Sequence, residues 1–150
     1  MRKLKRILLL LSLPCVAVVF SMAVYLCAVI SYDRNETVEY LTSHSEKKSK
    51  GLCACYVRHA LIAGGLPAYV KTSACNYPEI LPLYGFKEIE DPLVYRKGDI
   101  VTFPSVKNHP HGHIAMWNGE QWVSDFKQRG IIVNSAYKKV DYKIWRHRFG

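Results

Sequence analysis

The sequence has 150 residues and a net charge of +9, from 21 basic and 12 acidic side chains. Four of the basic residues lie within the first six, so the rest of the chain carries only 17 basic against 12 acidic side chains. The length leaves room for one domain of about 100 residues behind a separate N-terminal segment. No nucleic-acid-binding motif accompanies the charge, which excludes nucleic acid as an expected partner.

The first 30 residues read as a membrane anchor. Residues 1–6 are basic, and residues 7–30 contain no charged side chain. A helix needs about 20 apolar residues to cross a bilayer, so residues 7–30 predict a transmembrane signal anchor, with the basic flank in the cytoplasm. A cleavable signal peptide is the alternative, because Ser21–Ala23 is a suitable cleavage motif. We favour the anchor, since cleavage there would leave residues 24–30 as an exposed apolar end.

Residues 31–50 are mostly polar and end in a serine- and lysine-rich stretch. Segments with so little apolar content do not build a core. We therefore expect a tether here, followed by one domain over residues 51–150.

A helix is predicted to begin at Cys53. Tyr56, Val57, Ala60 and Leu61 recur at intervals of three and four, and a pair of glycines then provides a stop. The N-terminus of a helix favours a negative sulfur, because its N–H groups are unpaired and its dipole is positive there. Cys53 is thus a candidate thiol nucleophile, and Tyr56, one turn later, is a candidate for holding substrate or an oxyanion.

The following segments predict an antiparallel sheet. β-type runs occur at residues 97–103, 113–117 and 121–126, and Asn118-Gly119 between the last two is a strong hairpin signal. His113, at the start of a strand, would face the helix that carries Cys53. Asp125 on the next strand would orient the imidazole ring, so the sequence predicts a Cys-His-Asp site.

Three histidines alternate along one short stretch at His109, His111 and His113. Such spacing places side chains on one side of a strand, as in some zinc sites. Pro110 and Gly112 interrupt a regular strand, however, so we interpret His109 and His111 as loop residues at the rim of a cleft. Neither a metal nor another cofactor is expected.

These motifs resemble the cysteine, histidine-dependent amidohydrolase/peptidase (CHAP) group and its NlpC-type relatives, the papain-like hydrolases of bacterial peptidoglycan. The resemblance rests on residues 51–57, 98–101 and 112–115 and covers roughly residues 49–148. It implies an α+β papain-like domain with a nucleophile-bearing helix packed on a small antiparallel sheet. It also implies Cys53 as nucleophile and His113 as base. The third polar residue varies in this group, so Gln128 and Asn134 stand beside Asp125 as candidates, and Gln128 is also a candidate substrate or oxyanion contact.

The expected function is that of a membrane-anchored cysteine amidase or peptidase that cleaves amide bonds of peptidoglycan stem peptides. A non-catalytic wall-binding module on the same fold is the alternative. The expected location is the inner membrane, with the domain in the periplasm or outside the cell. Peptidoglycan and an inhibitor or immunity protein are the candidate partners. In an exported domain with Cys53 as nucleophile, Cys55 and Cys75 are the candidate disulfide.

Overall fold

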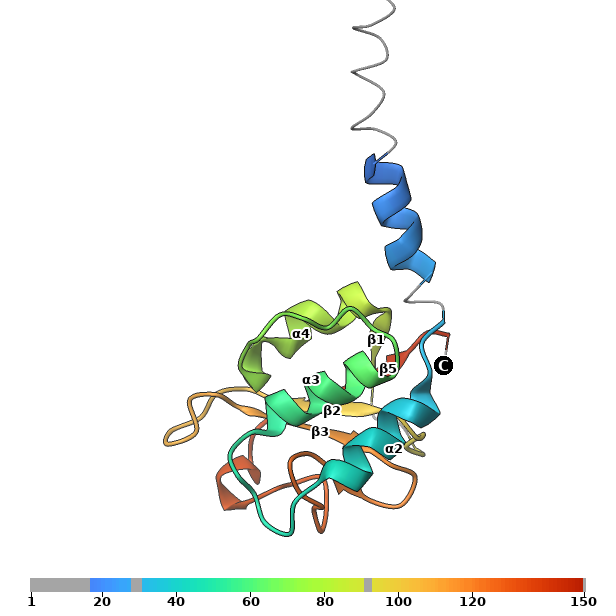
Figure 1. The fold of residues 1–150 in the computed structure, drawn as a ribbon. Coiled ribbons are helices and arrows are strands. Elements are labelled where there is room, and N and C mark those ends of the chain that lie inside the picture. Colours follow the sequence, from blue (N-terminus) through green and yellow to red (C-terminus); the bar gives the residue numbers. More distant parts are fainter. Residues whose placement is uncertain (1–16, 28–30, 91–92, 150) are drawn as a thin grey trace, which may run out of the picture.

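Five short strands form one antiparallel sheet with the order β1-β5-β2-β3-β4, and helices pack against it (Figure 1). This computed structural model describes residues 17–27, 31–90 and 93–149. The strands are β1 (Phe86–Ile89), β2 (Ile100–Phe103), β3 (His113–Trp117), β4 (Trp122–Val123) and β5 (Lys143–His147). The helices are α2 (Arg34–His44), α3 (Cys53–Ala63), η1 (Ala74–Asn76), α4 (Tyr77–Ile80), η2 (Leu81–Tyr84) and η3 (Ser135–Tyr137). The α+β class and the antiparallel sheet agree with the sequence prediction.

The strand pairs that the sequence predicts are present. In the β2–β3 pair Phe103 lies opposite His113. β3 and β4 form the predicted hairpin, in which the side chain of Asn118 accepts hydrogen bonds from two backbone N–H groups of the turn and Gly119 has a positive φ of 108°. The run at residues 121–126 is a strand only at Trp122–Val123, because the chain turns back directly afterwards.

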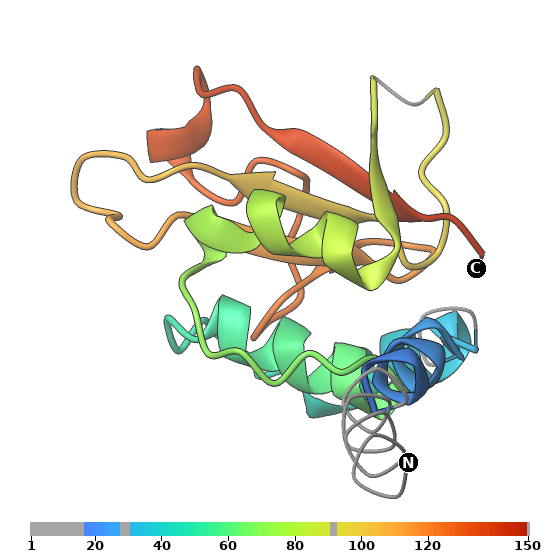
Figure 2. The ribbon, with the colours of Figure 1, turned by 90° about the horizontal axis from the view of Figure 1, so that it is seen from above.

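Two hydrophobic clusters occupy the two faces of the sheet. Ile114 and Met116 belong to the cluster that also contains buried residues of α2, α3 and α4, whereas Ala115 belongs to the other, with Phe103 and Tyr137. This alternation along β3 is the period of two expected for a strand. Figure 2 shows α2 and α3 along one face of the sheet and the loop between β2 and β3 reaching beyond it. α3, which packs against β3, is therefore held firmly above the sheet.

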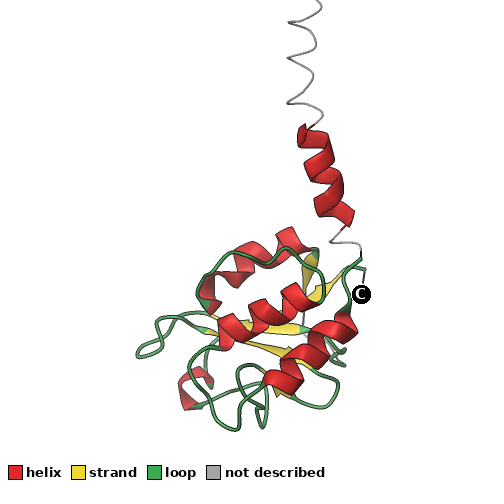
Figure 3. Cartoon of the chain, viewed as in Figure 1, coloured by secondary structure: helices red, strands yellow, loops and turns green. Residues whose placement is uncertain are grey.

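Residues 31–50 differ from the predicted polar tether. They contain α2, which packs against α3 (Figure 3). Asp33 caps this helix by accepting a 2.9 Å hydrogen bond from the backbone N–H of Glu36. Val38 and Leu41 are buried in the core. Few apolar residues suffice here, because they stand one turn apart and face the same neighbour.

The predicted transmembrane helix and the inner-membrane location require correction. Within the part of the chain that the structure describes, no helix has both the length and the apolar character needed to span a bilayer. Among the residues of the predicted anchor that the structure describes, 17–27 are helical. The remainder of the predicted anchor at residues 7–30, and the basic flank at residues 1–6, lie outside the described residues.

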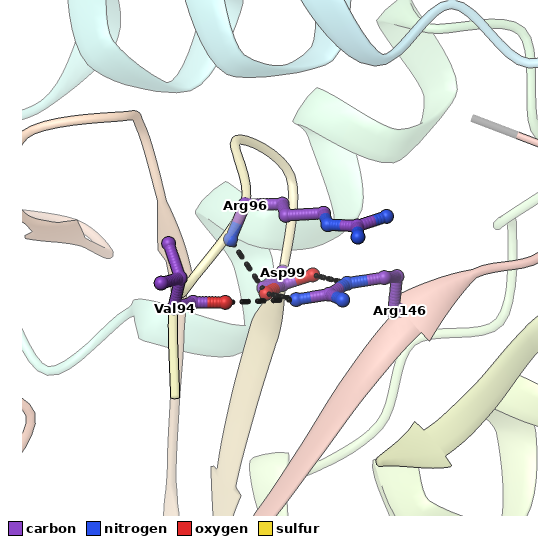
Figure 4. A network of polar contacts seen from close by, with 4 residues as sticks. All are labelled: Val94, Arg96, Asp99 and Arg146. Carbon is purple, nitrogen blue, oxygen red and sulfur yellow. Dashed lines mark hydrogen bonds and ion pairs between the residues drawn. The ribbon is translucent and has the colours of Figure 1, made fainter. Parts of the chain in front are cut away.

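A buried ion pair ties β5 to the start of β2. Asp99 is almost fully buried and accepts hydrogen bonds of 2.8 and 2.6 Å from the guanidinium group of Arg146 (Figure 4). The same carboxylate accepts a 2.8 Å hydrogen bond from the backbone N–H of Arg96. Such a bidentate pair fixes orientation as well as adding energy. It sets the register of β5 on the strand next to the one that carries His113.

Candidate active site

A cleft of about 490 Å³ lies where α3, β3 and the loop between β2 and β3 meet. Both Cys53 and His113 line it, as does Asp125. The structure therefore brings together the three residues that the sequence analysis assigns to catalysis. The other lining residues come from three loops and from η3: Ser49, Gly51, Asn108, His109, Pro110, His111, Gly112, Phe126, Val133, Asn134 and Tyr137.

Cys53 is the first residue of α3, as predicted, and its thiol is partly buried. Burial raises the pKa of this thiol, and the nearby negative charge of Asp125 acts in the same direction. Hydrogen bonding from the backbone N–H groups of Ile114, Ala54 and Cys53 itself lowers it, but the net direction is upward. The sequence analysis expects a lowered pKa from the helix N-terminus. In the folded protein desolvation outweighs that effect, because the sulfur sits against β3 rather than in water.

His113 begins β3 directly after Gly112, whose φ is 67°. A side chain at Gly112 would collide with the carbonyl oxygen of Phe103, so glycine is required to bring the loop in beside the strand. The His113 ring is buried, and its centroid lies 6.2 Å from that of Phe103 and 6.3 Å from that of Tyr137. Burial lowers the pKa of His113 to about 4, although the charge of Asp125 raises it. At neutral pH the imidazole is uncharged and can accept a proton.

Gln128 is the side chain that orients the ring of His113. Its Nε2 lies 2.8 Å from Nε2 of His113 and 3.1 Å from Oγ of Ser124, and the residue is buried. Its Oε1 is buried with no hydrogen-bond partner among the described residues. The amide can present either end to the ring. With Oε1 toward His113, the ring proton is held on Nε2, and Nδ1 is left with its lone pair.

Asp125 has different partners from those predicted. Its Oδ2 accepts hydrogen bonds from the backbone N–H groups of Lys50 at 2.6 Å and Leu52 at 3.2 Å, and from Oγ of Ser49 at 3.1 Å. Oδ1 accepts a 3.0 Å hydrogen bond from Ser124. Burial alone raises the pKa of Asp125, but these hydrogen bonds outweigh it and hold the pKa below its ordinary value. The carboxylate thus fastens the segment that leads into α3.

Tyr56 and the other two cysteines are not among the residues that line the cleft. The hydroxyl group of Tyr56 donates a 3.3 Å hydrogen bond to Glu46, and Tyr56 is absent from the cleft lining. Cys55 and Cys75 are free thiols in the structure. The first lies 3.9 Å from the guanidinium group of Arg58, and the second donates to Asn76 at 3.5 Å. The predicted disulfide between them is not formed.

His109 and His111 line the rim of the cleft, in the loop where the sequence analysis expects them. Nδ1 of His111 lies 2.9 Å from the hydroxyl oxygen of Ser73. Over the described residues, no group of three or more His, Cys, Asp or Glu side chains is placed to hold a metal ion.

Tyr137 is a cleft residue that the sequence analysis does not single out. It is buried, and among the described residues its hydroxyl group has no hydrogen-bond partner. Burial raises its pKa, and the thiols of Cys53 and Cys75 add to the effect. No sequence signal marks it, because it lies in an irregular segment after β4 and reaches the site through η3. Asn134, which caps η3 through its side chain, also lines the cleft.

Solved structures with the same fold include two forms of one complex. They are the native and the selenomethionine forms of the type VI effector-immunity complex Tae3-Tai3 from Ralstonia pickettii. The native form matches with a TM-score of 0.70 and 35% identity, over 77% of this chain and 99% of the matched chain. The selenomethionine form gives a TM-score of 0.68 and 37% identity, over 73% and 98% of the two chains. No family model and no curated protein matches the sequence.

Proposed function

This chain belongs to the family of Tae3, the effector of the Tae3-Tai3 complex, and we propose that it is a cysteine amidase that cleaves peptidoglycan stem peptides. The arrangement of Cys53, His113 and Gln128 is the observation that carries the proposal. A thiol at the first turn of α3 shares a cleft with a neutral imidazole whose Nε2 is hydrogen-bonded to a buried amide. Amide hydrolysis by a thiol requires this set of groups: a nucleophile, a base and a group that orients the base.

In the proposed reaction His113 acts first as a general base. It takes the proton from Cys53 as the sulfur attacks the amide carbonyl carbon, since both groups are neutral at pH 7. The carbonyl oxygen becomes an oxyanion, which backbone N–H groups that contact the sulfur, including that of Cys53, would stabilise. His113 then donates its proton to the leaving nitrogen, and the C–N bond breaks to give a thioester.

Water completes the cycle. His113 removes a proton from the attacking water, the C–S bond breaks, and the thiol of Cys53 is restored with release of the carboxylic acid product. The negative charge of Asp125 raises the pKa of His113, so it stabilises the imidazolium that forms twice in this sequence. Gln128 acts as a positioning residue, because a hydrogen bond at Nε2 limits rotation of the ring and leaves Nδ1 available to the thiol.

Two observations support a proposal for the substrate and the partner. The motifs around Cys53 and His113 resemble those of peptidoglycan hydrolases, and the family relative is an effector found in complex with an immunity protein. We therefore propose peptidoglycan as the substrate and an immunity protein as the partner that inhibits the enzyme.

Digestion of purified peptidoglycan tests this function. The full chain is incubated with the polymer, beside Cys53→Ala and the matched variant Cys55→Ser, and the released fragments are identified by mass spectrometry. We expect a new amine with the full chain and with Cys55→Ser but not with Cys53→Ala. Folded protein that releases nothing from walls of several chemotypes would instead indicate a non-catalytic wall-binding module.

A further inference from the structure

A basic groove of about 450 Å³ adjoins the candidate active site. We define it by its lining residues: Lys47, Lys48, Ser49, Phe126, Lys127, Gln128, Arg129, Ile132 and Val133. Three of these, Ser49, Phe126 and Val133, also line the catalytic cleft. The two hollows therefore share a wall, and a ligand that extends from the cleft can reach the basic groove.

The positive charges of the groove are brought together by the backbone. Glu46 forms a parallel bridge with Phe126, and its N–H donates a 2.7 Å hydrogen bond to the carbonyl oxygen of Asp125. The segments 46–49 and 126–129 consequently run side by side. Lys47 and Lys48 come from the first segment and Arg129 from the second, so cations far apart in the sequence face one hollow.

These charges are not neutralised within the groove. No carboxylate lines it, and among the described residues the ion pairs involve only Lys143 and Arg146. Glu46, the residue before Lys47, accepts a hydrogen bond from the hydroxyl group of Tyr56 and does not line the groove. Lys127 also lines a neighbouring hollow that contains Glu39 and Glu120. Lys47, Lys48 and Arg129 are therefore the cations available to a ligand in the groove.

We propose that the basic groove is a substrate subsite that binds the free carboxylates of an acidic stem peptide beside the amide that is cleaved. The inference rests on the proposed function, because it places the remainder of the same substrate. Stem peptides carry carboxylates on their glutamyl and diaminopimelyl residues, and amidation removes that charge. The apolar side chains of Phe126, Ile132 and Val133 complete the groove with a surface for the methylene groups between those carboxylates.

The subsite also adjoins the catalytic machinery. Gln128 lines the groove and contacts the ring of His113 at 2.8 Å. A stem peptide seated on Lys47, Lys48 and Arg129 would thus lie beside the amide that contacts His113. The enzyme should prefer stems with free carboxylates to amidated stems, with most of the preference in binding.

Binding to an inactive full chain tests the subsite without turnover. The probes are two soluble muramyl tetrapeptides, one with free glutamyl and diaminopimelyl carboxylates and one with both amidated, each titrated calorimetrically into Cys53→Ala. We expect the free form to bind about tenfold more tightly, the sum of a few partly exposed charge contacts. The preference should shrink in about 0.5 M salt, where such contacts are screened.

The variant Lys47→Gln/Lys48→Gln/Arg129→Gln, made in the Cys53→Ala background, should bind both probes equally. Its matched control is Lys71→Gln/Lys87→Gln/Arg148→Gln, which removes the same charge from exposed residues outside the groove and should keep the preference. Circular dichroism of each variant checks that it is folded.

Equal binding of the two probes by Cys53→Ala, binding of neither, or a preference that survives the groove substitutions would overturn the subsite. The proposed function fails separately. A full chain that binds and discriminates the probes but cleaves neither would refute the amidase and leave the subsite standing, whereas Cys53-dependent cleavage with no discrimination would refute the subsite alone.

Discussion

Replacing Asp125 distinguishes two roles for a buried carboxylate beside a catalytic histidine. If Asp125 fixes the tautomer of the ring, Asp125→Asn should lower kcat by about 10⁴ and leave stability almost unchanged, as in serine proteases. In this structure Asp125 instead accepts hydrogen bonds from Lys50, Leu52 and Ser49, in the segment before α3. We therefore expect the principal effect on the free energy of unfolding.

The size of that effect follows from the bonds that are lost. Hydrogen bonds to a charged acceptor contribute roughly 1.5–3 kcal/mol each, and several that share one oxygen are not additive. Asp125→Ala leaves the N–H groups of Lys50 and Leu52 without their acceptor, so we expect a loss of about 3–4 kcal/mol. Asp125→Asn keeps an acceptor oxygen and loses only the charge, for about 1–2 kcal/mol.

The sign of the pH dependence follows from the lowered pKa of Asp125. In the unfolded chain the carboxylate has its ordinary pKa of about 3.9. Its contribution to stability is therefore fully present above that pH and is lost as the pH falls through the lower folded-state value. In Asp125→Asn the stability should be less dependent on pH in this acid range than in the natural sequence.

Urea denaturation followed by tryptophan fluorescence measures these stabilities, and turnover of a muropeptide at neutral pH measures kcat. Ser43→Ala is a matched control, because it removes an exposed hydroxyl group that bonds only within and next to α2. A variant Asp125→Ala that loses less than about 1 kcal/mol, together with a fall in kcat of more than about a thousandfold in Asp125→Asn, would refute the helix-fastening role.

Three further predictions concern the site. Because burial lowers the pKa of His113 to about 4, kcat/KM should be flat through neutral pH and should fall as the pH drops through about 4; a fall centred near pH 6.5 would contradict a neutral, buried base. Gln128→Leu should lower kcat about 10- to 100-fold with KM little changed, and Gln128→Asn should not restore it, since the shorter amide does not reach the ring; wild-type kcat in Gln128→Leu would remove its positioning role. Gly112→Ala should cost about 2–4 kcal/mol in urea denaturation, because the methyl group meets the carbonyl oxygen of Phe103 at a positive φ; Gly119→Ala, which meets no atom within 4 Å but also has a positive φ, is the milder comparison and should lose less.

Local patterns in the sequence were sufficient for the elements that carry the nucleophile and the base. The helical spacing after Cys53 and the glycine pair beyond it predict α3, which ends at Ala63. Asn118-Gly119 predicts the β3–β4 hairpin. These features depend on the backbone preferences of residues that are neighbours in the sequence. They can therefore be predicted without knowledge of the tertiary contacts.

The predictions for residues 7–30 and 31–50 were wrong, because they were based on composition and not on contacts with other parts of the chain. A low apolar content over residues 31–50 does not show that Val38 and Leu41 lie one turn apart on the face that meets α3. For residues 7–30, an uncharged run is necessary for a membrane-spanning helix, but over the described residues no helix of that length and apolarity is formed.

The sequence by itself determined which residue types were available for thiol chemistry and on which local elements they stand. Only the tertiary structure decided which polar side chain meets His113. Asp125 and Gln128 are three residues apart, and the chain reverses between them, as the bridge between Val123 and Lys127 and the bond from Gln128 N–H to Trp122 show. That reversal turns Gln128 back to the ring and leaves Asp125 facing the segment before α3. The burial that raises the pKa of Cys53 and lowers that of His113 likewise arises from packing between distant segments, which no local pattern records.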